Sequence, residues 1–344
     1  DAQGRRTNAV QGAYPVSQAL QMLLEGTGLT AQATGPQTWT VVRIRPVEAA
    51  RPIAAAEPTQ LGELIVTAQK REERLIDVPQ SVTAVNAQDL LARGATQLRD
   101  FANTVPGLNF STAGAGYSQI SIRGVTSGVD VGQTVGIYVD EVPYGSSSVF
   151  GAASQHTLDV GLFDVERIEV LRGPQGTLYG ASALGGVLKY VSKAPDTRTF
   201  AGDVRAGVSA TRHGDINYNA SGALNMPLAV DTAALRASAF YSREGGYIDN
   251  EALDDENANA SEVYGGRIEL LFTPSERLSV RAAGFLQNIR RDGEGTVDYA
   301  FDGEPLAGKL DQIRLFAEPY YQDFRLLSAT VEYDLDWADL TSIT

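Results

Sequence analysis

The sequence predicts an α+β domain followed by antiparallel strands of the kind that form a transmembrane β-barrel, with a small α/β segment ahead of both. Three observations support this fold class. Glycine and tyrosine are abundant, with 35 and 14 residues, which suits strands and turns better than helices. Residues 165–193 hold two strand-like runs around a glycine-rich turn. Beyond residue 200, apolar and polar residues alternate in segments of about ten residues, the length of a membrane-spanning strand.

The composition excludes several classes of function. The chain has 28 Lys and Arg against 42 Asp and Glu, a net charge of −14, so it repels phosphates and no nucleic-acid partner is expected. It has no cysteine, which excludes a disulfide framework, a thiolate metal site and a cysteine nucleophile. The only histidines, His156 and His213, are too few for a histidine-rich metal site. The sequence has no run of about 20 apolar residues that would predict a transmembrane helix. Barrel strands give a weaker signal, so a membrane-spanning β-barrel is not excluded.

Residues 1–46 are expected to form the small α/β segment. Ser17 is the expected N-cap of an amphipathic helix, and Thr38–Ile44 alternates as a strand. The stretch GAYPVSQALQMLLEGTGL, followed by TWTVVRI, resembles the second half of the secretin/TonB short N-terminal domain, so we expect a partial copy of that domain. Residues 47–62 hold prolines among alanines and predict an extended linker.

A β-prone segment, Glu63–Ala68, directly follows the linker. It is followed by a charged run, Lys70–Arg74. One interpretation is an ordinary edge strand. The other is a strand that a flexible tether offers to a partner's sheet, which is the arrangement used in β-augmentation.

Five motifs in a fixed order carry a wider resemblance. The stretch ELIVTAQKREERLIDVPQSVTAV resembles the TonB box and the start of the plug domain of TonB-dependent outer-membrane receptors. VPGL at 105–108, ISIRG at 120–124, VGIYVDEVPY at 135–144 and RIEVLRGPQGTLYG at 167–180 follow in that family's order. Two departures stand out: Glu141 replaces the usual glycine, and LKYVS at 188–192 replaces a more common Asn-Ile-Val-Thr run. The resemblance implies a TonB box and plug domain over residues 63–198, with TonB bound by Glu63, Leu64, Ile65, Val66, Thr67 and Ala68.

The glycine-rich turn from Gly173 to Gly186 could be mistaken for a phosphate-binding loop. Such loops open a helix and commonly bring a lysine, whereas this turn has no lysine and lies between strand-like runs. We expect neither a nucleotide site nor any resident cofactor, and iron would enter only as a ligand chelate. Catalysis is not expected either, because Ser182 has no histidine in a motif relation and the acidic run 254–256 lies in a hydrophilic loop.

The last part of the chain, residues 199–344, is expected to be an incomplete barrel. Connections alternate between short ones, at 225–231 and 273–277, and long ones, at 244–262 and 290–320, as at the periplasmic and extracellular ends of such barrels. A soluble β-sandwich is the alternative, but it would not need that asymmetry. Plugged transporters have about 22 strands, so we expect a piece of a longer receptor. The expected strands lie near 203–212, 215–225, 233–243, 263–273, 277–288 and 322–336, with another starting at Leu340–Thr344.

Two groups of plug residues are candidates for function. Arg123, Glu169 and Arg172 should lie on buried strands, where charge must be paired. The family-like role is a lock between the plug and barrel residues such as Glu269 or Glu332, and an ion pair within the plug is the alternative. The loops at 111–119, 126–133 and 144–150 are expected to contact ligand, with these candidate side chains: Tyr117, Gln133, Tyr144 and Phe150.

The resemblance implies an energy-coupled importer in the Gram-negative outer membrane, embedded in lipid, with the N-terminal part and the start of the plug facing the periplasm. Its small-molecule ligand would be a ferric siderophore or related iron chelate. A carbohydrate or aromatic nutrient is the alternative, since fold does not fix ligand. The N-terminal domain adds signalling through an inner-membrane anti-sigma regulator as a further function. A purely structural or adhesive barrel is the remote alternative, because it would need no TonB box.

Overall fold

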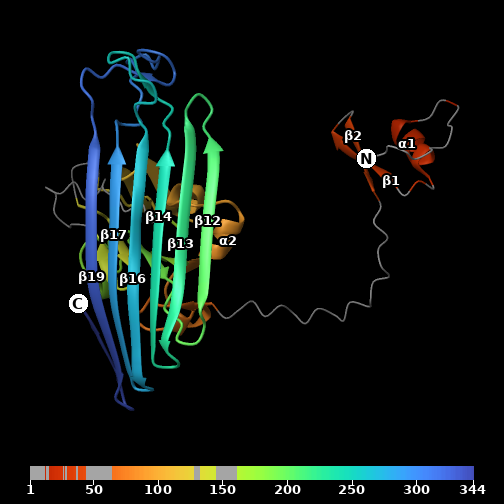
Figure 1. The fold of residues 1–344 in the computed structure, drawn as a ribbon. Coiled ribbons are helices and arrows are strands. Elements are labelled where there is room, and N and C mark those ends of the chain that lie inside the picture. The colour runs from red at the N-terminus through yellow and green to blue at the C-terminus, as the bar shows by residue number, and fades with distance from the viewer. Residues whose placement is uncertain are drawn as a thin grey trace. The chain divides into compact units, whose positions relative to one another are not determined.

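The computed structural model describes residue 12, residues 15–25, residue 27, and residues 29–35, 38–43, 64–127, 132–144 and 161–344. The chain divides into two compact units, Asp1–Gly62 and Glu63–Thr344, whose elements are labelled in Figure 1. Within the described residues, no helix has the length and apolar character needed to cross a membrane.

The first unit contains one helix and one antiparallel strand pair. Helix α1 (Val16–Leu24) is followed by β1 (Leu29–Gly35) and β2 (Thr38–Arg43). The expectation that Ser17 caps the helix is wrong, because the helix already begins at Val16 and its N-cap is Pro15. Proline suits a helix start, since its missing N–H would have no intrahelical partner there. The hydroxyl of Thr27 donates to the carbonyl of Leu24 at 2.5 Å and helps to end the helix.

The second unit begins with the plug, which is built on a five-stranded sheet in the order β5-β10-β11-β8-β9. Strands β10 and β11 are antiparallel neighbours, and β11 is parallel to β8. A separate hairpin, β6-β7, and the small pair β3-β4 complete its strands. The strands of the plug are β3 (Ile65–Val66), β4 (Glu73–Arg74), β5 (Val82–Asn86), β6 (Leu108–Thr112), β7 (Ser118–Ile122), β8 (Val135–Val139), β9 (Val142–Tyr144), β10 (Val165–Arg172) and β11 (Gly186–Ser192).

Short helices connect the first plug strands. The side chain of Asn86 accepts a hydrogen bond from the backbone N–H of Gln88 at 2.8 Å, so Asn86 is the N-cap of α2. Gly94 follows it with a φ of +83°. The helices are α2 (Ala87–Ala92) and α3 (Leu98–Phe101), with 3₁₀ turns η1 (Leu75–Asp77) and η2 (Ala102–Thr104).

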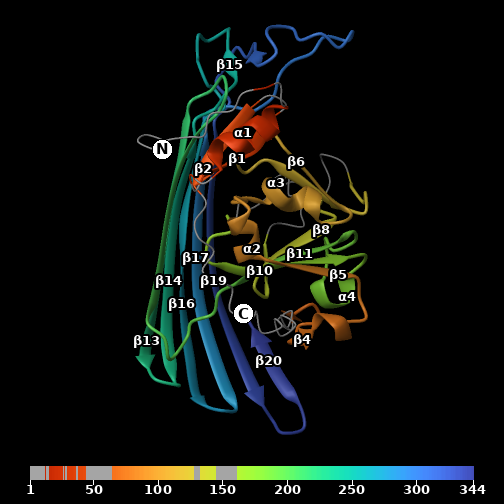
Figure 2. The ribbon, with the colours of Figure 1, turned by 90° about the vertical axis from the view of Figure 1, so that its right-hand side faces the viewer.

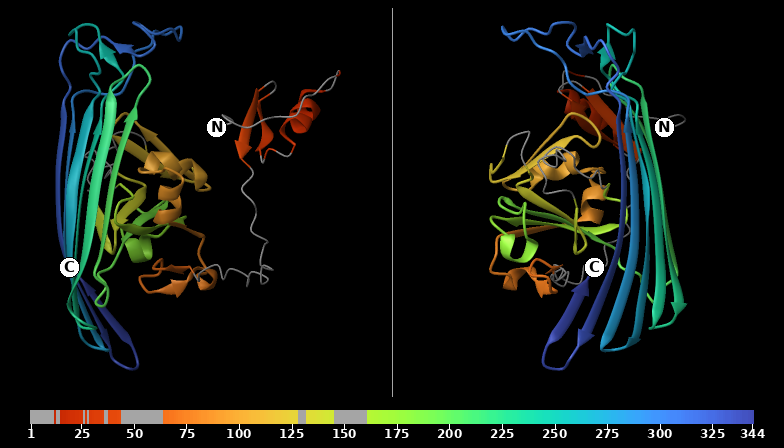
Figure 3. Two further views of the ribbon diagram at one scale, coloured as in Figure 1. Left: turned by 45° about the vertical axis from the view of Figure 1, so that its right-hand side comes forward. Right: turned by 90° about the vertical axis from the view of Figure 1, so that its left-hand side faces the viewer.

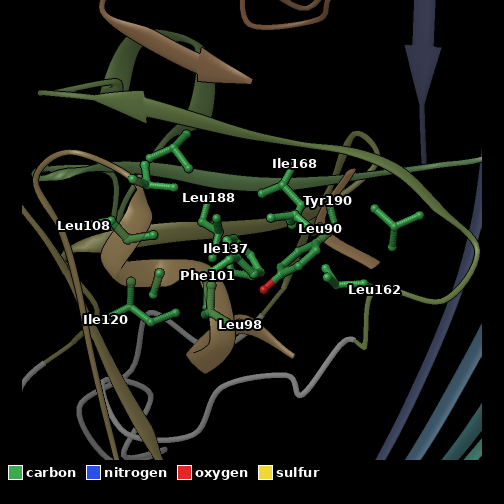
Figure 4. Packing of buried hydrophobic residues seen from close by; sticks show 14 of the residues in the cluster. Leu90, Leu98, Phe101, Leu108, Ile120, Ile137, Leu162, Ile168, Leu188 and Tyr190 are labelled. Atoms are coloured by element: carbon green, nitrogen blue, oxygen red, sulfur yellow. The ribbon is translucent and has the colours of Figure 1, made fainter. Parts of the chain in front are cut away.

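One apolar core holds the plug together. It lies between the sheet and the two helices, with Leu90, Leu98 and Phe101 from the helices packed against Ile137, Ile168 and Leu188 from the sheet (Figure 4). Fully burying an aliphatic or aromatic side chain contributes about 1.5–3 kcal/mol, so these residues stabilise the plug within its own chain segment.

The turn between β10 and β11 is more ordered than the sequence suggests. It contains a single helical turn, α4 (Gly176–Tyr179), where only a glycine-rich turn was expected. Tyr179 is buried beside Val187 and Leu171, and this packing explains the local helix. Gly186 closes the turn with a φ of +153°, and a Cβ there would lie 2.2 Å from the carbonyl oxygen of Leu171, so no other residue fits this position.

The rest of the unit is a seven-stranded antiparallel sheet in sequential order, β12-β13-β14-β16-β17-β19-β20. Figure 1 shows its long strands side by side. All seven strands overlap the stretches that the sequence predicts, with ends that differ by a few residues. They are β12 (Ala201–Ala210), β13 (Ile216–Ala229), β14 (Ala233–Glu244), β16 (Ser261–Ser275), β17 (Leu278–Arg291), β19 (Tyr320–Asp334) and β20 (Asp339–Ile343).

The two faces of this sheet have opposite character. On β16, Ile268 is 53% exposed, whereas its neighbour Glu269 is 3% exposed and Arg267 is buried as well. The plug lies against the concave face in the views of Figures 2 and 3, so the polar residues point toward the plug and the apolar ones point away. This pattern is the reverse of a soluble sandwich and is typical of a lipid-facing barrel wall.

The connections of the sheet confirm the predicted asymmetry. Two long connections, 245–260 and 292–319, lie at one end and carry the small pair β15 (Asp249–Asn250) and β18 (Asp311–Gln312). Short turns lie at the other end (Figure 2). The pair β3-β4 lies toward the end with the short turns, and the hairpin β6-β7 lies toward the end with the long connections (Figure 2).

Candidate functional site

The segment predicted to bind TonB is partly a strand and is already paired within the chain. Only Ile65 and Val66 form β3, where a strand of six residues was expected, and Glu63 lies outside the described residues. Ile65 pairs with Arg74 and Val66 with Glu73 of β4. The N–H of Leu75 also donates to the carbonyl of Leu64 at 2.8 Å. One edge of the segment is therefore occupied by the residues that follow it.

Side chains of this segment are docked in the plug. Val66 and Ala68 are both 0% exposed and pack in a second apolar cluster with Leu171, Tyr179 and Val187. The hydroxyl of Tyr179 donates to the carbonyl of Ala68 at 2.9 Å. Burial raises the pKa of Tyr179 above its ordinary value, and the carboxylates of Glu141 and Glu169 add to that shift, so the hydroxyl stays a donor at neutral pH.

Thr67 is held by a row of polar side chains across the plug sheet. Lys189 of β11 lies opposite Glu169 of β10 and Tyr138 of β8 in the strand registers. The Lys189 ammonium donates to the Thr67 hydroxyl at 2.6 Å and to its carbonyl at 3.3 Å. The Thr67 N–H donates to Glu169 Oε1 at 2.9 Å. We call Tyr138, Glu169 and Lys189, which lie side by side in the sheet, the box-binding row; Glu169 and Lys189 hold Thr67.

Charges around the row compensate one another. Lys189 is 1% exposed, and burial lowers its pKa below the ordinary value while Glu141 opposes that shift. Glu141 forms ion pairs with Lys189 and, at 2.8 Å, with Lys70. Lys70 also lies over the rings of Tyr138 and Tyr179, at 4.7 and 4.3 Å from their centres. The two sequence departures at Glu141 and Lys189 are therefore partners in one buried ion pair.

Within the described residues, the three residues predicted to lock the plug to the barrel form no ion pair with the seven barrel strands. Glu169 is paired inside the plug, where Arg167 Nε donates to it at 2.8 Å. Arg172 donates to the carbonyl of Pro106, another plug residue, at 3.4 Å. Arg123 follows β7 instead of lying on it, is exposed, and has a φ of +55°. Glu169 thus follows the alternative prediction, an ion pair within the plug. Glu332, one of the expected barrel partners, instead faces Arg281 on a neighbouring barrel strand.

Other charges join the plug to the barrel wall. Arg236 of β14 forms an ion pair with Asp164 of the plug, and its Nε donates to that carboxylate at 2.9 Å. Arg267 of β16 pairs with Glu269 on its own strand and lies 3.8 Å from Asp140 and 3.9 Å from Asp164. We call these five residues the plug–barrel charge cluster. At the end of β14, Glu244 pairs with Arg99 of α3.

Sequence reasoning missed this cluster apart from Glu269. Asp140 and Asp164 lie in turns of the plug, with φ values of +52° and +59°, and nothing local marks them as contacts of the barrel wall. A signal was present in the barrel strands, because Arg236, Arg267 and Glu269 all fall on the mixed face of the alternating pattern. Charges on the face that turns toward a plug need partners, and the plug must supply some of them.

The four candidate ligand residues have different surroundings. Tyr144 is buried, stacks edge-on against Phe324 of β19 at 4.5 Å, and its hydroxyl accepts a hydrogen bond from Gln322 at 2.8 Å. Tyr144 thus contacts the barrel wall. Gln133 lines a small cavity together with Gln119. Phe150 lies outside the described residues.

Tyr117 lies in a cluster that the sequence did not reveal. The guanidinium of Arg291, at the end of β17, lies 5.7 Å from the Tyr117 ring centre and 5.1 Å from that of Tyr320. Arg291 also donates to the carbonyl of Ala115 at 3.2 Å. This cation–aromatic cluster joins the tip of the β6-β7 hairpin to the barrel end that carries the long connections.

A plug domain on the polar concave face of an antiparallel sheet, with a docked strand ahead of it, defines the class of plugged β-barrel receptors. Residues 74–187 match the family described as "TonB-dependent Receptor Plug Domain", and residues 1–44 match "Secretin and TonB N terminus short domain". In these two stretches the chain is similar to TonB-dependent receptors.

Relatives agree with this assignment. The chain is 33% identical over 230 residues to the pesticin receptor of Yersinia pestis, a match that covers 65% of this chain and 32% of the relative. It is 25% identical over 295 residues to the ferripyoverdine receptor of Pseudomonas aeruginosa, covering 82% of this chain and 34% of the relative. The chain therefore spans about a third of the length of these curated relatives.

Solved structures have the same fold. The ferric yersiniabactin uptake receptor from Yersinia pestis superposes with a TM-score of 0.61 at 24% identity, covering 75% of this chain and 39% of that one. The ferripyoverdine receptor of the outer membrane of Pseudomonas aeruginosa gives a TM-score of 0.61 at 20% identity, covering 96% of this chain and 41% of that one.

Proposed function

We propose that this chain is part of an outer-membrane receptor that imports a ferric siderophore or related iron chelate with energy supplied through TonB. The observation that supports the substrate class most directly is that curated relatives sharing the plug and adjoining strands include a ferripyoverdine receptor. Iron enters this proposal as part of the transported chelate, with no resident cofactor and no catalytic step.

The test is uptake of iron-55-labelled ferric siderophores by a deletion strain with and without the restored gene. We expect uptake of at least one chelate to depend on the gene. Equal uptake of every iron source by both strains would contradict the proposal. Gene-dependent growth on a carbohydrate or aromatic nutrient would then support the alternative substrate class.

The TonB-binding role of residues 63–68 predicts a strong effect of proline. Ile65→Pro removes a backbone N–H and cannot complete a paired strand, so we expect energy-dependent uptake to fall by about 100-fold or more, the factor that corresponds to about 3 kcal/mol. Binding of the ligand to the outer face should stay unchanged. Ile65→Thr keeps the N–H and the β-branched shape and serves as the matched control, with uptake near that of the unmodified receptor.

Signalling is a second proposed function, favoured by the match of residues 1–44 to the short N-terminal domain. The partner would be an anti-sigma regulator in the inner membrane, with residues 1–62 on the periplasmic side. Deleting residues 1–44 should abolish ligand-induced transcription of a reporter while uptake continues. If both transcription of the reporter and uptake continued after the deletion, the signalling proposal would be contradicted and the transport proposal would not.

A further inference from the structure

The plug–barrel charge cluster and the box-binding row meet at two adjacent residues. Strands β8 and β9 are joined by the two-residue turn Asp140–Glu141, with Val139 paired to Val142. Asp140 faces Arg267 of the barrel wall. Glu141 pairs with Lys189 and Lys70 beside residues 65–68, which we call the TonB-box segment. Consecutive residues of one tight hairpin thus serve two separate charge networks.

The turn has little freedom to move one residue without the other. Asp140 has a φ of +52°, as two-residue hairpin turns require, and aspartate is among the residues that tolerate it. Its N–H donates to the carbonyl of Tyr190 at 2.8 Å. One oxygen of its carboxylate accepts from the Ser192 N–H at 2.8 Å and from the Ser192 hydroxyl at 2.7 Å. The turn is therefore tied to β11 at Tyr190 and Ser192, which closely follow Lys189.

Strand β11 provides a second connection between the same two networks. Lys189 holds Thr67, and four residues further on the carbonyl of Lys193 accepts from Arg267 at 3.2 Å. A shift of the Arg267 side chain would therefore remove two contacts at once: the cation that faces Asp140, and the hydrogen-bond donor to the carbonyl of Lys193. Both changes act on the elements that position Glu141 and Lys189.

We propose that the Asp140–Glu141 turn couples the barrel wall to the TonB-box segment, so that the pairing of Arg267 with Asp140 determines how firmly residues 65–68 are docked. The inference rests on the proposed role of that segment in binding TonB. Arg267, Asp140 and Glu141 act as positioning residues, since the described plug side chains that hydrogen-bond to Thr67 and Ala68 are those of Lys189, Glu169 and Tyr179.

The test measures docking of the segment directly in the purified intact receptor, without TonB or ligand. The sequence has no cysteine, so a spin label at Ile65→Cys reports this site alone. Ile65 is exposed, whereas Val66 is fully buried, so position 65 tolerates a label better. We expect an immobile spectrum in the parent, and a mobile component at least about threefold larger in Arg267→Met and in Asp140→Asn. Asp140→Asn keeps an acceptor for Ser192 while it removes the charge that faces Arg267.

Two controls separate coupling from general loosening. Arg281→Met removes an arginine from the neighbouring strand β17, whose partner Glu332 is also in the barrel, and should leave the spectrum unchanged. A second label at Gln88→Cys on α2 should also stay unchanged in every variant. Unchanged spectra at position 65 in both Arg267→Met and Asp140→Asn would overturn the proposal, and so would equal mobilisation at position 88.

A double-variant comparison completes the test. If the turn carries the coupling, Glu141→Gln and Arg267→Met combined should mobilise the label less than the product of their separate effects. Independent, multiplicative effects would contradict a shared path. Because the readout needs neither uptake nor TonB, failure of the coupling leaves the transport proposal to its own test.

Discussion

Lys189→Met is expected to free the TonB-box segment from the plug. The substitution keeps the length of the side chain but leaves the carboxylates of Glu141 and Glu169 near an apolar group, and it removes the donor to Thr67. Removing one member of a buried ion pair costs about 3–5 kcal/mol. Hydrogen exchange at the Thr67 amide, which donates to Glu169, should therefore be about 100-fold faster or more.

The matched control lies just after the docked segment. Arg71 is 68% exposed at its side chain, forms an ion pair with Glu73 and donates to the side chain of Gln69, and exposed pairs of this kind contribute little. Arg71→Met should leave Thr67 exchange unchanged. If Lys189→Met also left it unchanged, the box-binding row would not be what docks the segment.

Arg236→Met is expected to loosen the contact between plug and barrel. Arg236 and Asp164 are both largely buried, with side chains 12% and 5% exposed, and Asp164 would keep only the more distant Arg267 at 3.9 Å. Leaving that carboxylate unpaired should weaken plug docking by about 3–5 kcal/mol. The measurement is the urea concentration at which the plug becomes accessible to protease while the barrel remains folded.

Two further variants sharpen this result. Arg281→Met on β17 removes a half-buried arginine whose ion-pair partner, Glu332, lies on the barrel strand β19, and should leave the urea midpoint near that of the parent. Replacing Arg236 and Asp164 together, by methionine and asparagine, should restore part of the loss, because no charge is then left unpaired. A midpoint that is the same in Arg236→Met and the parent would contradict the role of this pair.

The sequence predicted the barrel strands well because their information is local. Alternation such as Arg267-Ile268-Glu269-Leu270 has a period of two residues, so the sequence of each strand shows which residues lie on which face of the sheet. The cap at Ser17 failed because proline and serine both favour helix starts, and the helix begins after Pro15.

The order of motifs determined the family and the position of the TonB-box segment, but not what holds that segment in place. Glu141 and Lys189 are visible in the sequence only as two separate departures from the family pattern. They become one ion pair because β8 and β11 are parallel neighbours. Likewise, the expected lock at Glu169 and Arg172 turned out to lie within the plug, whereas Asp164 and Arg236 join it to the barrel. The sequence by itself therefore determined the strands, their faces and the receptor class. Only the tertiary structure decided which charges meet, because a buried charge takes its partner from whichever strand or turn lies against it, however distant in the chain.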